Sequence, residues 1–274
     1  MRVQIVDPAA QTPPFDRSLA AALARAGADP ELVTSHFIHS ELAPPDGYRV
    51  TESFYPRSSR LPSGSLARRA LGLAEHVPGM LRHRRGARDA DVVDYQWLTL
   101  PGLDARFLPR GPRLVMTTHG FLRGDEGGPV ASAALARMDA AIALTEYGAA
   151  KLRASGAIDP DRVHVIPHGA FDYLTRLPRE RPLPPELEGA GGPVILSFGL
   201  IRPYKGVDVL LRAFAELGAD ARDAELWVVG RPLGVDVAAL ERPAAAAPGR
   251  VRLLARFVAG AEVPAIFRRA DVVA

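Results

Sequence analysis

The sequence predicts an α/β protein with two Rossmann-like domains, each built on a parallel sheet. Short apolar runs typical of buried strands alternate with segments whose apolar residues recur every three or four positions, as they do in helices. This series is interrupted once, by a stretch rich in Pro, Gly and Glu at residues 177–193. The 274 residues are enough for two ordinary domains. We expect one domain at residues 1–178, a linker at 179–192 and a second domain at 193–274.

The composition excludes several classes of protein. The chain is 47% hydrophobic and 24% charged, as in soluble globular proteins, and its net charge of +3 is too small to indicate a nucleic-acid partner. It has no Cys, which rules out disulfides, thiol catalysis and Cys-ligated metal. The N-terminus lacks the long apolar stretch of a secretory signal, and no segment approaches the roughly 18 apolar residues of a membrane helix. We therefore expect a cytoplasmic protein.

The loop after the first expected strand, at residues 2–6, argues against a dinucleotide-binding domain. Residues 7–15 read DPAAQTPPF and contain no glycine. A G-x-G-x-x-G fingerprint is needed at this point so that the backbone can approach a pyrophosphate. A nicotinamide or flavin dehydrogenase built on this unit is therefore disfavoured.

A helix is expected next, with Asp16 as its N-cap and Gly27 at its end. Strands are predicted at residues 31–37 and 48–54, separated by a Pro- and Gly-containing turn. These elements continue the alternation of strands and helices expected of a parallel sheet.

Residues 65–84 are expected to form a helix that Pro78 and Gly79 break. The apolar face of this helix is predicted to consist of Leu66, Ala70, Leu73 and Val77. The helix runs into a basic patch, Arg82–Arg88. One interpretation is a solvated helix end, where cations suit the negative pole of the helix dipole. The other is contact with anionic lipid headgroups, which would place the protein at the membrane periphery.

A histidine marks the end of one of the later strands expected in the first domain. The strand at residues 113–118 runs into His119 and Gly120, followed by a polar loop. Because ligands bind at the carboxyl edge of a parallel sheet, His119 is a candidate active-site residue. The alternative is a packed or surface histidine. No second His or carboxylate recurs at the spacing of metal ligands, so no metal site is predicted.

The second domain opens with the most informative stretch of the chain. An apolar strand at residues 194–198 ends at Gly199, a loop carries Arg202 and Lys205, and an amphipathic helix follows Gly206. Strand, tight loop and helix together offer backbone N–H groups and a positive dipole end to an anion. Two cations at that end predict a site for a diphosphate, formed by these four residues. The alternative is that both cations are solvated loop charges.

The end of the chain gives a further expectation. Strands are predicted at 225–229 and 251–258, a helix at 262–269, and the start of another strand at 271–274. Parallel strands are usually buried on both faces, so a chain that ends within one predicts a truncated second domain. We expect its sheet to be incomplete, with Leu226, Val228, Val251 and Leu253 next to uncovered apolar surface or an unpaired strand edge.

These pieces occur in an order that resembles the family 4 glycosyltransferases, retaining enzymes with the two-domain GT-B fold. The matching stretches are PPFDRSLAAALARAG at 13–27, THG at 118–120, VHVIPHG at 163–169, ILSFGLIRPYKGVDVLLRAF at 195–214, ELWVVGRP at 225–232 and the tail from 250. The resemblance implies transfer of a sugar from a nucleotide-diphospho-sugar donor to a hydroxyl of a glycan, lipid or small-molecule acceptor. It implies no obligatory cofactor beyond that donor substrate.

The resemblance also implies roles for individual residues. Arg202 and Lys205 match the positions that contact the donor phosphates and stabilise the leaving nucleotide, and His119 matches a histidine that lies by the sugar. The sequence departs from the family pattern at Pro13 and Pro14, where many members have a glycine pair. It also ends before the family's motif of two Glu separated by seven residues could appear. Two alternatives therefore stay open: an epimerase or phosphorylase of the same fold, and an inactive fragment that only binds.

Overall fold

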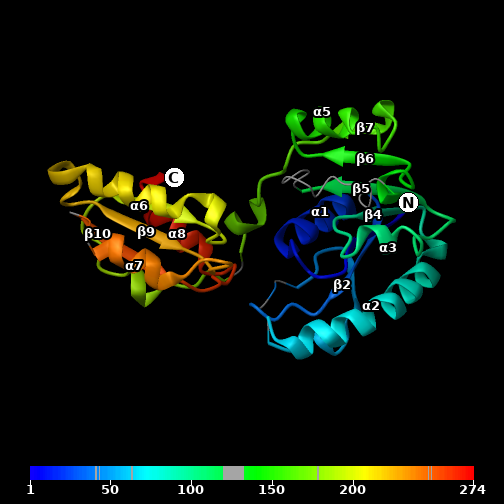
Figure 1. The fold of residues 1–274 in the computed structure, drawn as a ribbon, viewed down its shortest axis with the longest axis horizontal. Coiled ribbons are helices and arrows are strands. Elements are labelled where there is room, and N and C mark those ends of the chain that lie inside the picture. Colours follow the sequence, from blue (N-terminus) through cyan, green and yellow to red (C-terminus); the bar gives the residue numbers. More distant parts are fainter. Residues whose placement is uncertain are drawn as a thin grey trace. The chain divides into compact units, whose positions relative to one another are not determined.

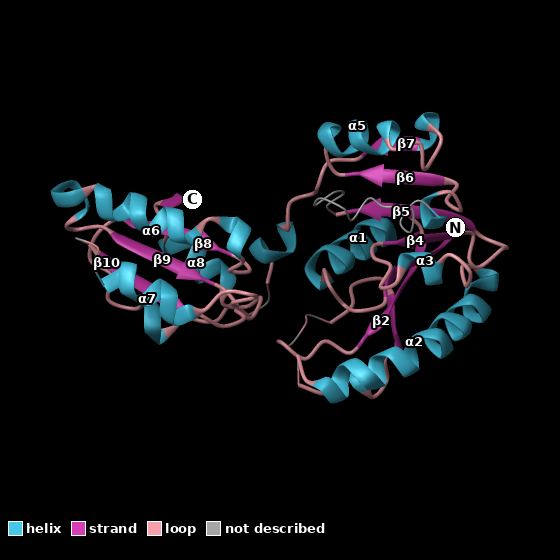
Figure 2. Ribbon diagram, viewed as in Figure 1, coloured by secondary structure: helices cyan, strands magenta, loops and turns pink. Residues whose placement is uncertain are grey.

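The computed structural model describes residues 1–40, 42, 44–62, 64–119, 133–177, 179–245, 247 and 249–274. The chain forms two compact units: unit 1 is Met1–Ile38 with Pro44–Phe171, and unit 2 is His39–Ala43 with Asp172–Ala274. Each unit contains one sheet in which every strand pair is parallel. The predicted α/β class with two parallel sheets is therefore confirmed (Figures 1 and 2).

Unit 1 is built on a seven-stranded sheet of order β3-β2-β1-β4-β5-β6-β7. Its strands are β1 (Arg2–Asp7), β2 (Asp29–Ser35), β3 (Arg49–Phe54), β4 (Val92–Tyr95), β5 (Arg113–Thr118), β6 (Ala140–Ala143) and β7 (Val163–Val165). The helices described in this unit are α1 (Pro13–Arg25), α2 (Leu66–Gly86), α3 (Pro101–Asp104) and α5 (Glu146–Ala154). Val3 and Ile5 of β1 pack with α1 in one core, whereas Val6 belongs to a second core that includes α2 and α5. Both faces of the sheet are therefore covered.

The first helix begins four residues earlier than the sequence predicted. Pro13 and Pro14 occupy its first two positions and Thr12 is its N-cap, so the assignment of Asp16 as N-cap is wrong. Proline suits the first turn because the N–H that it lacks would have no partner within the helix. The predicted end is correct, since Gly27 follows the helix with a φ of +85°. Strand β2 lies two residues before its predicted position.

Helix α2 differs most from its prediction. It continues through Pro78 to Gly86, and Gly79 serves packing instead of breaking the helix, because a Cβ there would lie 3.0 Å from the Phe54 ring. Leu66 and Leu73, predicted to be buried, are 80% and 67% exposed. The buried face of α2, which packs against the rest of unit 1, consists of His76, Gly79, Met80 and His83. This face is largely polar, which is why a search for apolar periodicity selected the wrong side.

Unit 2 is built on a four-stranded sheet of order β10-β9-β8-β11. Its strands are β8 (Val194–Phe198), β9 (Glu225–Val229), β10 (Arg250–Leu254) and β11 (Val272–Val273), and its helices are α6 (Val207–Glu216), α7 (Val237–Ala245) and α8 (Val263–Arg269). Helices α6 and α7 cover one face, and α8 with Leu187 covers the other.

Both faces of this sheet are covered, so the expectation of uncovered apolar surface is wrong. The expectation of an unpaired strand edge is confirmed for Val251 and Leu253, because β10 is an edge strand of the described sheet. Leu226 and Val228 are 0% and 1% exposed, and Val251 and Leu253 are partly buried against the same core as α6 and α7. Among the strands described in this unit, large apolar side chains are exposed on edge strand β11, where Val272 and Val273 are more than half exposed, and at Phe198 of β8, which is 38% exposed.

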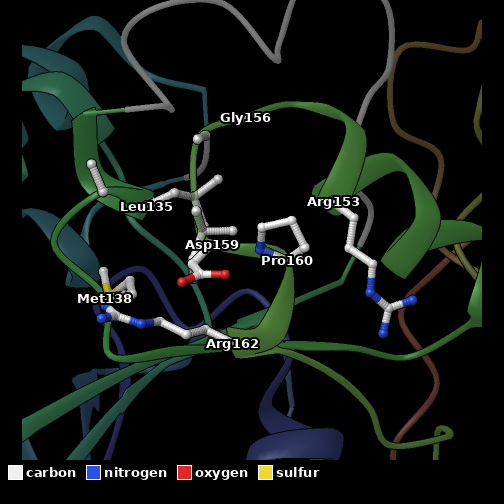
Figure 3. Close-up of a pocket in the computed structure, with 10 residues that line it drawn as sticks. Leu135, Met138, Arg153, Gly156, Asp159, Pro160 and Arg162 are labelled. Atoms are coloured by element: carbon white, nitrogen blue, oxygen red, sulfur yellow. The ribbon is translucent and has the colours of Figure 1, made fainter.

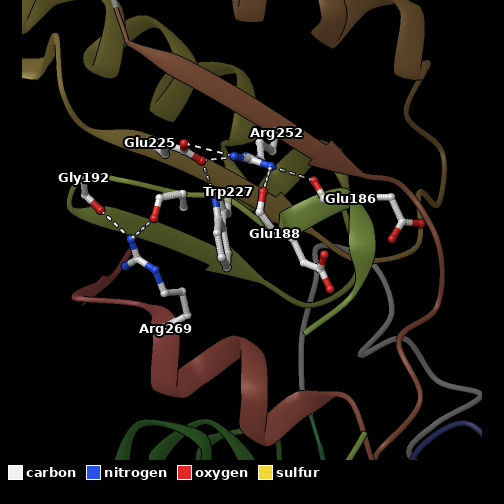
Figure 4. A network of polar contacts seen from close by, with 8 residues as sticks. Glu186, Glu188, Gly192, Glu225, Trp227, Arg252 and Arg269 are labelled. Carbon is white, nitrogen blue, oxygen red and sulfur yellow. Dashed lines mark hydrogen bonds and ion pairs between the residues drawn. The ribbon is translucent and has the colours of Figure 1, made fainter. Parts of the chain in front are cut away.

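Arg252 binds the backbone of residues 186–188 at the amino end of this sheet (Figure 4). Its guanidinium forms a fork with Glu225, at 2.6 Å from Nε to Oε2 and 3.1 Å from Nη2 to Oε1. Its Nη1 donates to the carbonyls of Glu186 and Glu188, at 3.2 and 2.7 Å. Arg269 donates to the carbonyl of Gly192 at 2.7 Å, so two arginines hold residues 186–192 on unit 2.

Candidate functional site

His119 follows β5 at the carboxyl edge of the sheet of unit 1, as predicted. Its ring stacks on the Trp97 ring, with centroids 5.2 Å apart and 14° between the planes. The Phe15 ring meets it edge-on at 4.6 Å. Two aromatic rings, one from the segment after β4 and one from the start of α1, therefore fix the orientation of this imidazole. Gly120 and the polar loop after it, with Asp125 and Glu126, lie outside the described residues.

A polar chain behind His119 determines which of its nitrogens carries the proton. Gln96 Nε2 donates to Asp94 Oδ2 at 2.8 Å, and Thr117 Oγ1 donates to Asp94 Oδ1 at 2.9 Å. The amide oxygen of Gln96 then faces His119 Nε2 at 2.8 Å. An amide oxygen can only accept, so Nε2 carries the proton and Nδ1 keeps a free lone pair.

Burial shifts the pKa values of both His119 and Asp94. Burial, and next the nearby His168, lower the pKa of His119 to about 4, so the imidazole is neutral at pH 7. Burial raises the pKa of Asp94 to about 7, although hydrogen bonds from Thr117 and Gln96 act in the opposite direction. Unit 1 thus presents a neutral imidazole with a fixed tautomer at the edge where ligands bind.

The loop between β1 and α1 is organised by an aspartate instead of glycines. Asp7 Oδ2 accepts from the N–H groups of Gln11 and Thr12, at 2.5 and 3.0 Å. Those two N–H groups are therefore not available to a pyrophosphate, in line with the absence of a dinucleotide fingerprint. Burial, and next the charge of Asp7, raise the pKa of neighbouring Asp16 well above its ordinary value. Trp97 Nε1 donates to Thr12 Oγ1 at 2.9 Å, which ties this loop to the ring that stacks on His119.

Sequence reasoning missed most of this cluster. The sequence predicts a strand at residues 92–97, which contains Asp94, Gln96 and Trp97, but it indicates no role for these three residues. It places His168 only in the matching stretch VHVIPHG. The Phe15 ring contacts both imidazoles: its centroid lies 4.6 Å from that of His119 and 5.0 Å from that of His168. The available signal was the placement of polar residues at the end of β4, a strand otherwise typical of a buried position.

The predicted diphosphate site lies in unit 2, at the carboxyl ends of β8 and β9. Gly199 ends β8 with a φ of +125°, a conformation that L side chains rarely adopt. Gly230 ends β9, and a Cβ there would lie 1.7 Å from the Gly199 carbonyl oxygen. The backbones of the two strand ends therefore touch, which only glycine at position 230 allows.

Arg202 and Lys205 lie between Gly199 and α6, as predicted. Gly206 is the N-cap of α6 with a φ of +68°, and its lack of a side chain leaves the first N–H groups of the helix open. Arg202 is half-buried, and its Nε is buried without a hydrogen-bond partner among the described residues. Lys205 is exposed, with Nζ 5.6 Å from the centroid of the Tyr204 ring. The structure thus brings Gly199, Arg202, Lys205 and Gly206 into one loop of unit 2, whereas His119 lies in unit 1.

A cavity of about 360 Å³ in unit 1 is lined neither by His119 nor by the loop from Gly199 to Gly206 (Figure 3). It lies at the amino ends of β6 and β7, the edge opposite to His119. Its polar groups stabilise local structure: Arg153 donates to the Val163 carbonyl at 2.9 Å, and Asp159 Oδ1 accepts from the Asp161 N–H at 3.0 Å. We assign this cavity no role in ligand binding.

Comparison with protein families identifies the chain. Residues 17–170 match the model described as Glycosyltransferase Family 4, which covers more than half of the sequence. The chain belongs to glycosyltransferase family 4. Residues 192–274 of this family 4 chain match a second model, described as Glycosyl transferases group 1.

One curated relative of this family 4 chain is the GDP-mannose-dependent alpha-(1-6)-phosphatidylinositol monomannoside mannosyltransferase of Mycolicibacterium smegmatis. The two are 29% identical over 205 residues, which are 70% of this chain and 49% of the relative. The chain therefore spans about half of that relative's length.

Solved structures similar to this family 4 chain show the same fold. Sucrose-phosphate synthase from Thermosynechococcus elongatus has a TM-score of 0.69 at 15% identity, covering 100% of this chain and 74% of its own. HepE from Anabaena, in complex with UDP and glucose, has a TM-score of 0.65 at 17% identity, covering 100% and 73%. A UDP-N-acetylglucosamine 2-epimerase has a TM-score of 0.63 at 15% identity, covering 100% and 73%. These likenesses show the fold alone and confirm the predicted GT-B class.

Proposed function

We propose that the protein transfers a sugar from a nucleotide-diphospho-sugar to an acceptor hydroxyl, with retention of the anomeric configuration. The observation that carries this proposal is the loop from Gly199 to Gly206. A half-buried guanidinium with an unpartnered Nε stands there beside an ammonium and the open N-terminus of α6. A buried N–H without a partner costs about 1–3 kcal/mol, and a phosphate oxygen would remove that cost.

The proposed chemistry needs charge stabilisation more than a strong base. The bond between the anomeric carbon and the donor phosphate breaks, and its electron pair leaves with the diphosphate. The acceptor oxygen bonds to the same face of that carbon, and its proton passes to the departing phosphate oxygen. Arg202 and Lys205 stabilise the charge that develops on the diphosphate, so the reaction needs no obligatory metal. His119, neutral and with Nδ1 free to accept, positions a sugar hydroxyl.

A donor screen tests this function. GDP-mannose is the first donor to supply, because the curated relative uses it, and UDP-glucose and UDP-N-acetylglucosamine follow. With phosphatidylinositol vesicles or free sugars as acceptors, we expect a glycoside with the anomeric configuration of the donor by NMR, at a rate that EDTA does not change. An inverted product would contradict the retaining mechanism. Release of a free 2-epimerised sugar without any acceptor would identify an epimerase instead.

We also propose that the basic patch Arg82–Arg88 contacts anionic lipid at the membrane surface. Arg82, Arg85 and Arg88 are exposed at the end of α2, the same helix that exposes Leu66 and Leu73. None of the helices among the described residues combines the length and apolar character required to cross a bilayer. The protein is expected to sediment with vesicles of anionic phospholipid, and Arg85→Glu with Arg88→Glu to reduce that fraction several-fold. Equal sedimentation of parent and double variant would contradict the contact.

A further inference from the structure

A second cavity of unit 1, of about 480 Å³, lies at the carboxyl edge of the sheet. Its walls come from the loops after β1, β3 and β4, from the end of β2, and from the first half of α2. Its volume falls within the range of about 300–1,000 Å³ that is usual for small-molecule sites. Its position is also the edge where parallel sheets bind ligands.

One wall residue carries a buried hydroxyl that has no partner. Ser59 is 2% exposed, and its Oγ makes no hydrogen bond among the described residues. The adjacent Ser58 differs, because its Oγ donates to Glu75 Oε2 at 2.7 Å. A buried hydroxyl is normally satisfied. The Ser59 hydroxyl is therefore a buried polar group that the described part of the chain leaves without a partner.

Two further hydroxyls at the cavity are held in place by a buried relay. His76 Nε2 lies 2.5 Å from Asp104 Oδ1, and His76 Nδ1 lies 2.7 Å from the Tyr55 hydroxyl. The Tyr55 hydroxyl in turn donates to Thr99 Oγ1 at 3.2 Å. Tyr55 also has a φ of +47°, an uncommon backbone conformation for a residue other than glycine. The network thus fixes the Tyr55 and Thr99 hydroxyls at the cavity wall, within reach of a polar ligand.

Two arginines place positive charge at the cavity. Arg68 and Arg69 lie in the first turn of α2, next to the positive end of the helix dipole, and that turn contains no acidic residue. Arg68 Nη1 donates to the carbonyls of Ser59 and Leu61, at 3.2 and 2.7 Å, and the other N–H groups of its guanidinium make no hydrogen bond to the described residues. Arg69 is exposed and has no ion-pair partner in the part of the chain that the structure describes. Uncompensated positive charge at this point favours an anionic ligand.

We propose that this cavity binds a phosphorylated polyol, with the phosphate at Arg68, Arg69 and Ser59 and the hydroxyl groups at Tyr55 and Thr99. Identifying this ligand as the sugar acceptor rests on the proposed function. The cavity and His119 share one loop, since Thr99 at the cavity is two residues after Trp97, whose ring stacks on that imidazole. Leu73, also at the cavity, is 67% exposed. The same head group could therefore be supplied free or as part of a phospholipid.

Calorimetry with sorbitol 6-phosphate, and flotation with vesicles of phosphatidylglycerol in phosphatidylcholine, test the two sources. We expect Ser59→Ala and Arg69→Gln each to weaken binding of the accepted probe about tenfold. Ser59→Ala should not lower the melting temperature, because it removes a hydroxyl with no partner in the fold. Arg25→Gln, at an exposed arginine of α1, is the matched control and should bind like the parent.

The outcomes separate the possibilities. Loss of sorbitol 6-phosphate binding in the two variants supports a free polyol phosphate, and loss confined to vesicle binding supports a lipid head group. Binding of neither probe by the parent, or equal binding by all variants, overturns the proposal. GDP and UDP binding, measured on the same samples, reports on unit 2. A failure of the polyol site is thereby distinguished from a failure of the proposed transferase function.

Discussion

Replacing Arg202 or Lys205 with alanine is expected to weaken GDP or UDP binding about 10- to 100-fold, because each variant loses a charge-assisted hydrogen bond worth about 1.5–3 kcal/mol. The loss for Arg202 should exceed that for Lys205. Arg202 is half-buried with an unpartnered Nε, whereas Lys205 is exposed and its charge is better solvated. Isothermal calorimetry with each nucleotide diphosphate measures both affinities.

The chain provides a matched control for each variant. Lys151, the other lysine of the sequence, lies over the Tyr147 ring at 5.1 Å, much as Lys205 lies over Tyr204 at 5.6 Å. Lys151→Ala therefore removes an equivalent lysine–tyrosine contact away from the phosphate loop. Arg212→Ala removes an arginine further along α6. Both controls should bind nucleotide like the parent. If Arg202→Ala and Lys205→Ala do so too, the two cations are solvated loop charges and the diphosphate site is wrong.

The second large effect is expected for His119→Ala, which should reduce turnover about 100-fold while nucleotide affinity stays close to that of the parent. This imidazole acts on the sugar in the proposed mechanism. Removing a group that acts in the transition state lowers turnover but leaves ground-state binding of the nucleotide unchanged. Because the pKa of His119 is about 4, the parent rate should show no His119 titration across the neutral pH range. Steady-state kinetics against pH provide the measurement.

Gln96→Leu tests the hydrogen-bond chain behind this imidazole. It removes the amide oxygen that faces His119 Nε2 at 2.8 Å, so both tautomers become accessible and turnover should fall about tenfold. Nitrogen-15 NMR of the ring reports the tautomer directly, which a purely structural role would not alter.

An unchanged rate in His119→Ala, or loss of its fold by circular dichroism, would show that the residue is structural.

Much of the fold could be predicted because buried parallel strands are apolar throughout and are punctuated by glycine. The loop from Gly199 to Gly206 was predicted for the same reason, since strand, glycine, cations and amphipathic helix are adjacent in sequence. Helix α2 itself was predicted, but its buried face was not, because that face carries His76 and His83, whose partners Asp104 and Tyr95 are distant along the chain. The role of Gln96 also depends on knowing that β4 pairs with β5. Polar networks become visible only when the register of the sheet is known.

The arginine contacts of unit 2 have a consequence for limited proteolysis. Residues 186–192 have the composition of a protease-sensitive connector, and Glu186 and Glu188 are exposed. Their carbonyls are nevertheless bound by Arg252, and Leu187 between them is fully buried. A glutamate-specific protease needs an extended, detachable backbone to cleave after either residue. Cleavage at this stretch therefore requires that Arg252 first release the segment. The cleavage rate then measures how often the amino end of the sheet opens.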